Sequence, residues 1–176
     1  MIPRQLFLPA LTVLAVLSLL PIAVWPNDRI ADDMPDVDYI DTREPWREQE
    51  VRLPAYPANL DELIQLNVAA QGMPYRVYID PASLTTGKDR VVRFTSILVS
   101  SSGVWNVTYE GLHCGERTYR RYAFGSDGVW HSLKQSPWQR VSGGGINQYR
   151  KLLYDDYLCE VATPYLSRDE LLYKLR

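Results

Sequence analysis

The residue types that most often carry chemistry are scarce in this chain. Its 176 residues include two cysteines, Cys114 and Cys159, and two histidines, His113 and His131. These four side chains lack the close paired spacing of a structural zinc site, so we expect no metal and no cofactor. The G-x-S-x-G motif of hydrolases is also missing. His113 and Cys114 are neighbours in a predicted strand, where adjacent side chains point to opposite faces, so they are a poor nucleophile and base. We predict no catalytic residues.

Neither sign of charge dominates the whole chain. Nineteen Lys and Arg residues stand against 21 Asp and Glu residues, which gives no general reason to expect a nucleic acid partner. The acids are concentrated, however, because residues 26–50 hold nine of them and only three arginines. With few apolar groups to offset the entropy of ordering, this stretch is predicted to be an acidic linker. An acidic patch for a basic partner is the alternative interpretation.

Charge is missing altogether from Leu6 to Trp25. An apolar run of this length is what a bilayer requires, and Arg4 supplies the positive flank of a secretory signal. The order of charges keeps the amino terminus inside and exports the rest of the chain. We therefore predict that residues 1–25 are a signal peptide or an N-terminal membrane anchor. Residues 6–25 would contact the membrane if they are not cleaved.

The remainder, residues 51–176, is long enough for a single domain with a real core. Asn59 and Glu62 resemble a capping box, which predicts a short helix from Leu60 to about Val68. The strand patterns that follow are "YRVYID" ending at Pro81, "VVRFTSILVS", "VWNVTYEG", "RTYRRYAF", "VWHSL" and the possible edge strand "WQRV". "TTGKDR" and "GSDG" have the composition of turns, and Gly111 is the expected site of a bulge.

Helical periodicity replaces the strand pattern near the end of the chain. In "INQYRKLLYDDYLCE" one stripe is formed by Ile146, Tyr149, Leu153 and Tyr157. A last short helix, "RDELLYKL", is capped by Ser167 with Glu170. Strands in meander order followed by helices predict an α+β fold. We expect an antiparallel meander sheet of about five or six strands with a C-terminal helix packed on one face.

The two cysteines are predicted to form a disulfide. Both follow the export signal, neither is left over, and exported proteins meet an oxidising compartment. One lies at the end of a strand and the other on the edge of the predicted helix, so a bridge would tether helix to sheet. Closing a loop of about 46 residues stabilises the fold by roughly 4 kcal/mol in the chain-entropy model.

One segment mixes arginine with aromatic side chains. Arg117, Tyr119, Arg120 and Arg121 form the candidate binding face, which could take an anionic glycan or a nucleic acid. Arginine stems alternating with aromatic rings on an exposed sheet face explain the same pattern without a ligand.

Several of these motifs, taken together, resemble a known family. "DPASLTTGKDRVVRFT", "NVTYEGLHC" and the late "YLC" are similar to the cryptic neisserial protein-like family of exported bacterial proteins. The resemblance runs from about "LPAYPANL" to "YRKLLYDDYLC", implies a location in the cell envelope and supplies no catalytic residues. More distantly, the order of elements is similar to the surface-adhesin protein E family, whose sheet carries a disulfide-tethered helix and which binds host extracellular proteins. Unlike that family, this chain lacks a lipobox and has a long acidic linker.

The combined expectation is a non-enzymatic exported protein of the cell envelope. It would be periplasmic or anchored at the outer face of the bacterial inner membrane, and its sheet face or acidic linker would contact a protein partner, with no nucleic acid bound. An adhesin-like surface protein that binds extracellular ligands is the first alternative. An enzyme of unrecognised type is the second.

Overall fold

The computed structural model describes residues 44–67, 72–160 and 166–176. The predicted signal or anchor, residues 1–25, and residues 26–43 of the predicted linker lie outside the described residues. Residues 44–176 belong to one compact unit. Within the described ranges, no helix has the length and apolar character needed to cross a membrane.

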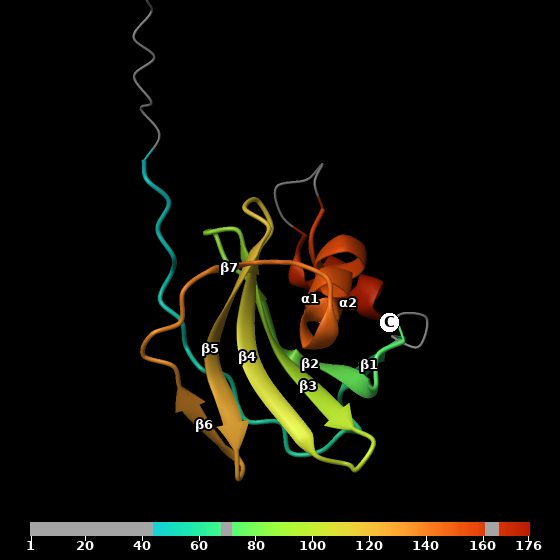
Figure 1. The fold of residues 1–176 in the computed structure, drawn as a ribbon. Helices are drawn as coiled ribbons and strands as arrows, with labels where there is room; N and C mark the ends of the chain where they lie inside the picture. Colours follow the sequence, from blue (N-terminus) through green and yellow to red (C-terminus); the bar gives the residue numbers. More distant parts are fainter. Residues whose placement is uncertain (1–43, 68–71, 161–165) are drawn as a thin grey trace, which may run out of the picture. The chain divides into compact units, whose positions relative to one another are not determined.

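Six strands follow one another across a single antiparallel sheet (Figure 1). They are β1 (Ile64–Leu66), β2 (Tyr75–Thr86), β3 (Val91–Ser100), β4 (Trp105–His113), β5 (Thr118–Ser126) and β6 (Val129–Ser132). A seventh short strand, β7 (Gln139–Arg140), pairs with the beginning of β5, while β6 pairs with its end. This order confirms the predicted meander sheet.

The central strand and the tightest hairpin formed as their sequences predicted. In β3 every residue from Val91 to Val99 is buried, as a strand that is apolar on both faces requires. The hairpin between β5 and β6 turns through Asp127 and Gly128, whose φ angles of 52° and 77° are left-handed. Asp and Gly are residues that tolerate this backbone conformation, so "GSDG" is confirmed as a hairpin turn.

Three local predictions were wrong. Residues 64–66 of the predicted helix Leu60–Val68 form β1 instead. Ile64 and Leu66 pair with β2 and pack on the core, and these tertiary contacts outweigh the weak helix signal of a single capping box. The β2 strand does not end at Pro81, since a shift in register between Asp80 and Thr85 lets it continue to Thr86. The bulge expected at Gly111 lies one pair earlier, between Tyr109 and Glu110, where Tyr122 is the extra residue on β5.

The helical segments cover one face of the sheet. Three helical elements follow directly on one another: the 3₁₀ turn η2 (Gly145–Asn147), the α-helix α1 (Gln148–Leu152) and the π-helical turn η3 (Leu153–Leu158). The α-helix α2 (Arg168–Leu175) comes after them. Tyr149, Leu153 and Leu171 bury their side chains in the main core. Ile146 was predicted to join them but is 58% exposed, because it lies in η2 before the regular helix begins. The capping box of Ser167 and Glu170 is confirmed.

A disulfide ties these helical turns to the sheet. Cys114, after the end of β4, is bonded to Cys159, after the end of η3, with Cα atoms 5.3 Å apart. Tyr154 adds a hydrogen bond from its hydroxyl to the Cys114 carbonyl oxygen at 2.7 Å. The predicted bridge and the packing of the helix on one face are therefore both confirmed. A bridge of this kind indicates an oxidising, exported compartment.

The opposite face of the sheet is covered by the segment that enters the domain, residues 44–63, which runs behind the strands in Figure 1. Tyr56 and Leu60 pack on a second core cluster there. The Trp46 indole Nε1 donates to the Asp89 carbonyl oxygen at 2.8 Å, and Glu48 forms ion pairs with the sheet. Residues 44–50 were assigned to the linker but belong to the folded unit, because these contacts order them in spite of their acidic composition.

Candidate binding pocket

A pocket of about 450 Å³ opens on the helix-covered face of the sheet. Side chains from β4, β5, β7, η2 and α1 surround it, so it lies where the first helical turns meet the strands farthest from β1. We call it the Arg121 pocket. Its lining includes Asn106, Thr108, Arg121, Phe124, Gln139, Ile146, Asn147, Tyr149 and Arg150. The volume falls in the range of sites for small ligands or single inserted groups.

A buried carboxylate is hydrogen-bonded to two residues that line this pocket, Tyr149 and Arg150. Glu110 is 0% exposed. One of its oxygens accepts from the Tyr149 hydroxyl at 2.6 Å and from the Ser96 hydroxyl at 2.8 Å, and the other accepts from Arg150 Nε at 2.7 Å. Burial and the nearby Glu110 carboxylate raise the pKa of Tyr149 well above its ordinary value, so this phenol stays a donor. The buried charge is thus neutralised and fully hydrogen-bonded.

The same network fixes the orientation of two amide side chains. The Arg150 guanidinium lies over the rings of Tyr119, at 4.4 Å, and Tyr149, at 4.6 Å, and it donates through Nη1 to Asn147 Oδ1 at 2.7 Å. The Tyr119 hydroxyl donates to Gln139 Oε1 at 2.6 Å. With both amide oxygens occupied, Asn147 and Gln139 are left with their NH₂ groups as donors. No acceptor for either NH₂ group occurs among the described residues.

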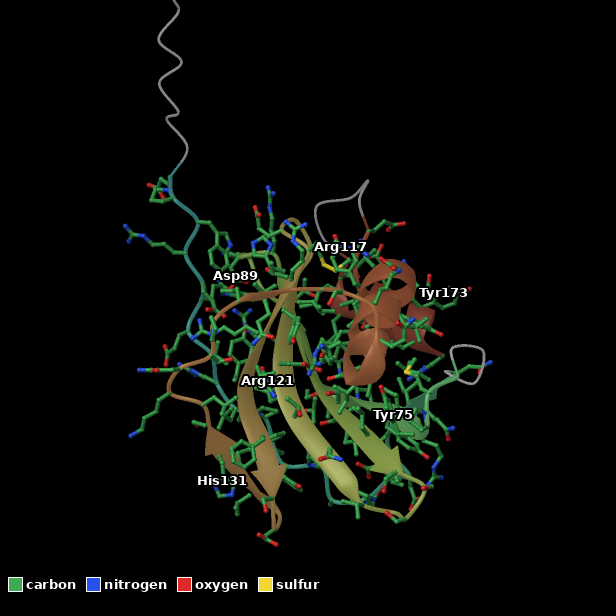
Figure 2. All side chains as sticks on the ribbon, in the orientation of Figure 1. Tyr75, Asp89, Arg117, Arg121, His131 and Tyr173 are labelled. Atoms are coloured by element: carbon green, nitrogen blue, oxygen red, sulfur yellow. A yellow bond between two sulfur atoms is a disulfide. The ribbon has the colours of Figure 1, made fainter. Side chains whose placement is uncertain are left out.

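Arg121 supplies the free positive charge. It pairs in register with Glu110 and so lies on the helix-covered face, where its side chain is exposed (Figure 2). In the described parts of the chain it has no carboxylate partner. The rim next to it is apolar: Phe124 is 46% exposed, and its ring stacks on His131 with centroids 5.0 Å apart. The Arg121 pocket therefore combines hydrogen-bond donors and a free cation with an apolar edge.

The four residues of the predicted binding face do not share one surface. Arg117 is engaged by Asp155 at 2.8 Å and lies over the Tyr154 ring at 4.4 Å. Tyr119 is buried but lines the Arg121 pocket together with Arg121, whereas Arg120 is on the opposite face of the sheet. Of the four, Arg121 alone keeps an exposed and unpaired charge. The strand alternation of side chains already separates Arg120 from Arg121.

A family model matches residues 41–176. The chain belongs to the CNP1-like family. This match agrees with the resemblance to the cryptic neisserial protein-like family that the sequence motifs indicated. Neither the curated proteins nor the solved structures include a match to the chain. The similarity to the surface-adhesin family stays an expectation from the sequence.

The opposite face of this CNP1-like protein carries a second polar network. The Glu48 carboxylate accepts from Arg120 Nη1 and from the Tyr122 hydroxyl, each at 2.6 Å. Arg93 Nη2 donates to Asp89 at 2.5 Å. Burial alone would raise the pKa of Asp89, but hydrogen bonds from Arg93 and from the Gln49 backbone lower it below its ordinary value. These charges are occupied with one another and hold residues 44–50 on the sheet.

Both histidines of the CNP1-like chain pack against aromatic rings. His113 lies edge-on to Trp46, with centroids 4.8 Å apart, and to Trp138, at 6.0 Å. Its Nδ1 accepts from the Glu116 backbone N–H at 3.1 Å. Burial lowers the pKa of His113, so the ring favours the neutral form. Among the described residues, no group of three or more side chains could hold a metal ion.

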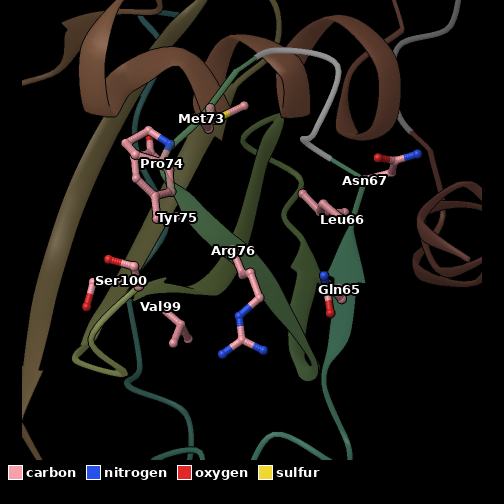
Figure 3. A pocket seen from close by; sticks show the side chains of 10 residues that line it. Gln65, Leu66, Asn67, Met73, Pro74, Tyr75, Arg76, Val99 and Ser100 are labelled. Carbon is pink, nitrogen blue, oxygen red and sulfur yellow. The ribbon is translucent and has the colours of Figure 1, made fainter.

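A second cavity of the CNP1-like chain, of about 620 Å³, lies beside β1 and β2 (Figure 3). Its lining is largely apolar, with Leu66, Met73 and Val99 among its members. Arg76 extends past it and lies 5.8 Å from the centroid of the Tyr78 ring. We assign no role to this cavity.

Proposed function

We propose that this CNP1-like protein is a non-enzymatic binding module of the cell envelope. In this proposal it resides in the periplasm or at the outer face of the bacterial inner membrane and contacts a partner protein through the Arg121 pocket. The location is supported by the disulfide between Cys114 and Cys159 and by the apolar run of residues 6–25 behind Arg4.

The observation that carries the proposal is the contrast between Arg121 and the other arginines of the same segment. Arg117 and Arg120 are held by carboxylates of this chain, whereas Arg121 has no carboxylate partner among the described residues. It is exposed beside Phe124 and Ile146, two large apolar side chains that also line the pocket. Arginine and aromatic side chains are the residues enriched at protein interfaces.

The absence of enzymatic activity is part of the proposal. Glu110 is bonded to residues of the pocket lining, but it is fully buried and its oxygens accept three hydrogen bonds from side chains of this chain, so it does not face a substrate as a general base must. His113 packs between Trp46 and Trp138, and His131 stacks on Phe124. These contacts are typical of structural roles rather than of an acid and base pair.

Site-specific photocrosslinking in living cells tests the proposed interface. We expect p-benzoylphenylalanine in place of Phe124 to give a discrete adduct with one envelope protein. The matched control replaces Tyr173, an aromatic residue on α2 that is 84% exposed, and it should not give that adduct. No adduct from position 124, or the same adducts from both positions, would contradict the proposed interface.

The location is tested separately, by N-terminal sequencing of the mature protein and by membrane fractionation. A cleaved chain in the periplasmic fraction or an intact chain in the inner-membrane fraction agrees with the proposal. A chain that remains in the cytosol with free thiols would contradict export.

A further inference from the structure

We propose that the Arg121 pocket is a carboxylate site that accepts a monoanionic group carried on an apolar body. This inference rests on the proposed function, because it names the chemistry by which a partner would be recognised. In that case the partner supplies an Asp, Glu or C-terminal carboxylate with an apolar neighbour.

The first argument is the set of hydrogen-bond donors. Gln139 and Asn147 have their amide oxygens occupied by Tyr119 and Arg150, so each presents only NH₂ to the pocket. Arg121 adds the fork of a guanidinium, which matches the two oxygens of a carboxylate. The amide oxygens of Gln139 and Asn147 are occupied by side chains of this chain while their NH₂ donors are left over, so a ligand with acceptor oxygens fits this side of the pocket.

The second argument is charge. Arg121 and Arg150 line the pocket, and the Glu110 carboxylate neutralises Arg150 at 2.7 Å. The two guanidinium groups and one carboxylate leave a net charge of about +1 by the one-charge-per-residue count. A carboxylate balances that charge, whereas a doubly charged phosphate or sulfate would leave an excess of negative charge on a partly enclosed site.

The third argument is the rim. Phe124 and Ile146 are exposed at the edge of a pocket whose interior is polar. An apolar body attached to the carboxylate would cover these two side chains while its oxygens reach the donors. A carboxylate ligand without an apolar part would leave Phe124 and Ile146 exposed to water, so it would gain no hydrophobic stabilisation from them.

The pocket is tested with a small acid that has both parts. N-acetyl-L-phenylalanine is titrated into the protein isolated from the cell envelope, and binding is followed by NMR at the Arg121 Nε and Phe124 amide signals. We expect saturable shifts, with N-acetyl-L-phenylalanine amide and sodium sulfate binding about tenfold or more weakly because they lack the carboxylate. Equal binding of the amide or of sulfate would overturn the proposal.

Two arginine variants locate the site. Arg121→Gln should weaken binding of the acid about tenfold or more, since it removes a charge-assisted pair of hydrogen bonds. Arg76→Gln, which changes an exposed arginine outside this pocket, should leave binding unchanged. Because Arg121 forms no internal ion pair in the described chain, its variant should unfold at the same temperature as the parent, and this separates loss of binding from loss of fold. Equal losses in both variants would refute the site.

Competition separates this inference from the proposed function. If the acid suppresses the adduct formed at position 124, the partner supplies the carboxylate and both proposals stand. If the acid binds but no adduct forms, the carboxylate site stands as a site for a free small acid and the protein interface fails. If an adduct forms and the acid does not bind, the interface stands and the carboxylate site fails.

Discussion

Arg120 and Arg121 are neighbours in sequence and have different environments, because successive residues of a strand point to opposite faces. Arg120 forms an ion pair with Glu48 on the face covered by residues 44–63, whereas Arg121 lies on the helix-covered face, where the described part of the chain gives it no carboxylate partner. The sequence shows this alternation but not the position of Glu48, which is 72 residues away from Arg120. Which arginine stays free is therefore decided by tertiary contacts.

Glycine at position 111 shows a similar dependence on distant residues. A Cβ atom at this position would lie 2.5 Å from the Tyr122 hydroxyl oxygen and 2.7 Å from Val91 Cγ1. The sequence suggested a bulge at Gly111, but the glycine is required because the Tyr122 ring lies against it. A glycine inside a strand pattern thus indicates a local constraint, but the side chain that imposes it is known only from the structure.

We predict that His113 makes stability depend on pH below about 6.5. Burial lowers the pKa of His113 from its ordinary value of 6.5, so the unfolded chain binds a proton at a higher pH than the folded chain does. The stability that comes from the neutral ring is complete above pH 6.5 and is lost as the pH falls toward the folded-state pKa. Protonation at Nδ1 would also remove the acceptor for the Glu116 N–H.

Urea denaturation between pH 7.5 and 5.5 measures this effect as the free energy of unfolding. The slope against pH should be smaller in His113→Gln than in the parent chain. His131→Gln is the matched control, because that ring is exposed on β6, and it should keep the parental slope. A parental slope in His113→Gln would show that other groups cause the pH dependence.

At the scale of elements, the sequence predicted those whose signals are local. The apolar run of β3, the Asp127–Gly128 turn and the Ser167 cap each depend on residues close together in the chain, and each is confirmed. The β1 strand is different, because Ile64 and Leu66 become a strand only by pairing with β2. The end of β2 was also missed, since the register shift after Asp80 depends on its partner β3.

The disulfide is the element-scale feature with the largest expected energetic effect. We predict that replacing both cysteines with alanine lowers the free energy of unfolding by about 4 kcal/mol, because the bridge closes a loop across 45 positions of the chain. The domain should still fold, since the Glu110 and Arg150 pair and the core side chains of α1 continue to hold the helix on the sheet.

Guanidinium denaturation followed by tryptophan fluorescence gives this free energy. Native-state hydrogen exchange should show faster exchange at α1 and η3 than in the parent, with less change in β3, if the bridge tethers the helical turns. The parent chain treated with a reductant is the control and should match the double variant. An unchanged denaturation midpoint in both would show that the bridge contributes little to stability.

At the scale of the molecule, the sheet is closed on both faces by segments from opposite ends of the described chain. Residues 145–158 and 168–175 cover one face and residues 44–63 cover the other. Composition placed the end of the linker at residue 50, because acids are dense up to that point. Residues 44–50 are acidic and still fold onto the sheet, because Glu48 forms ion pairs with Arg93 and Arg120 and accepts a hydrogen bond from Tyr122.

This arrangement predicts where the domain begins. A chain of residues 44–176 should be more stable than a chain of residues 51–176 by about 2–4 kcal/mol. The shorter chain loses the Glu48 carboxylate, which leaves Arg120 without its ion pair and the buried Tyr122 hydroxyl without its acceptor. It also loses Trp46, whose ring lies against His113 and Trp138. Urea denaturation of the two chains at pH 7 measures the difference.

Glu48→Gln in the chain of residues 44–176 separates the charge from the rest of the segment. Glutamine can still accept from Tyr122 but carries no charge for Arg120, so its loss of stability should be smaller than that of the shorter chain. If the chains that start at residues 44 and 51 have equal free energies of unfolding, residues 44–50 do not stabilise the domain and belong to the linker. A difference that Glu48→Gln reproduces in full would instead assign the whole effect to this one carboxylate, because Trp46 and the backbone of the segment are unchanged in that variant.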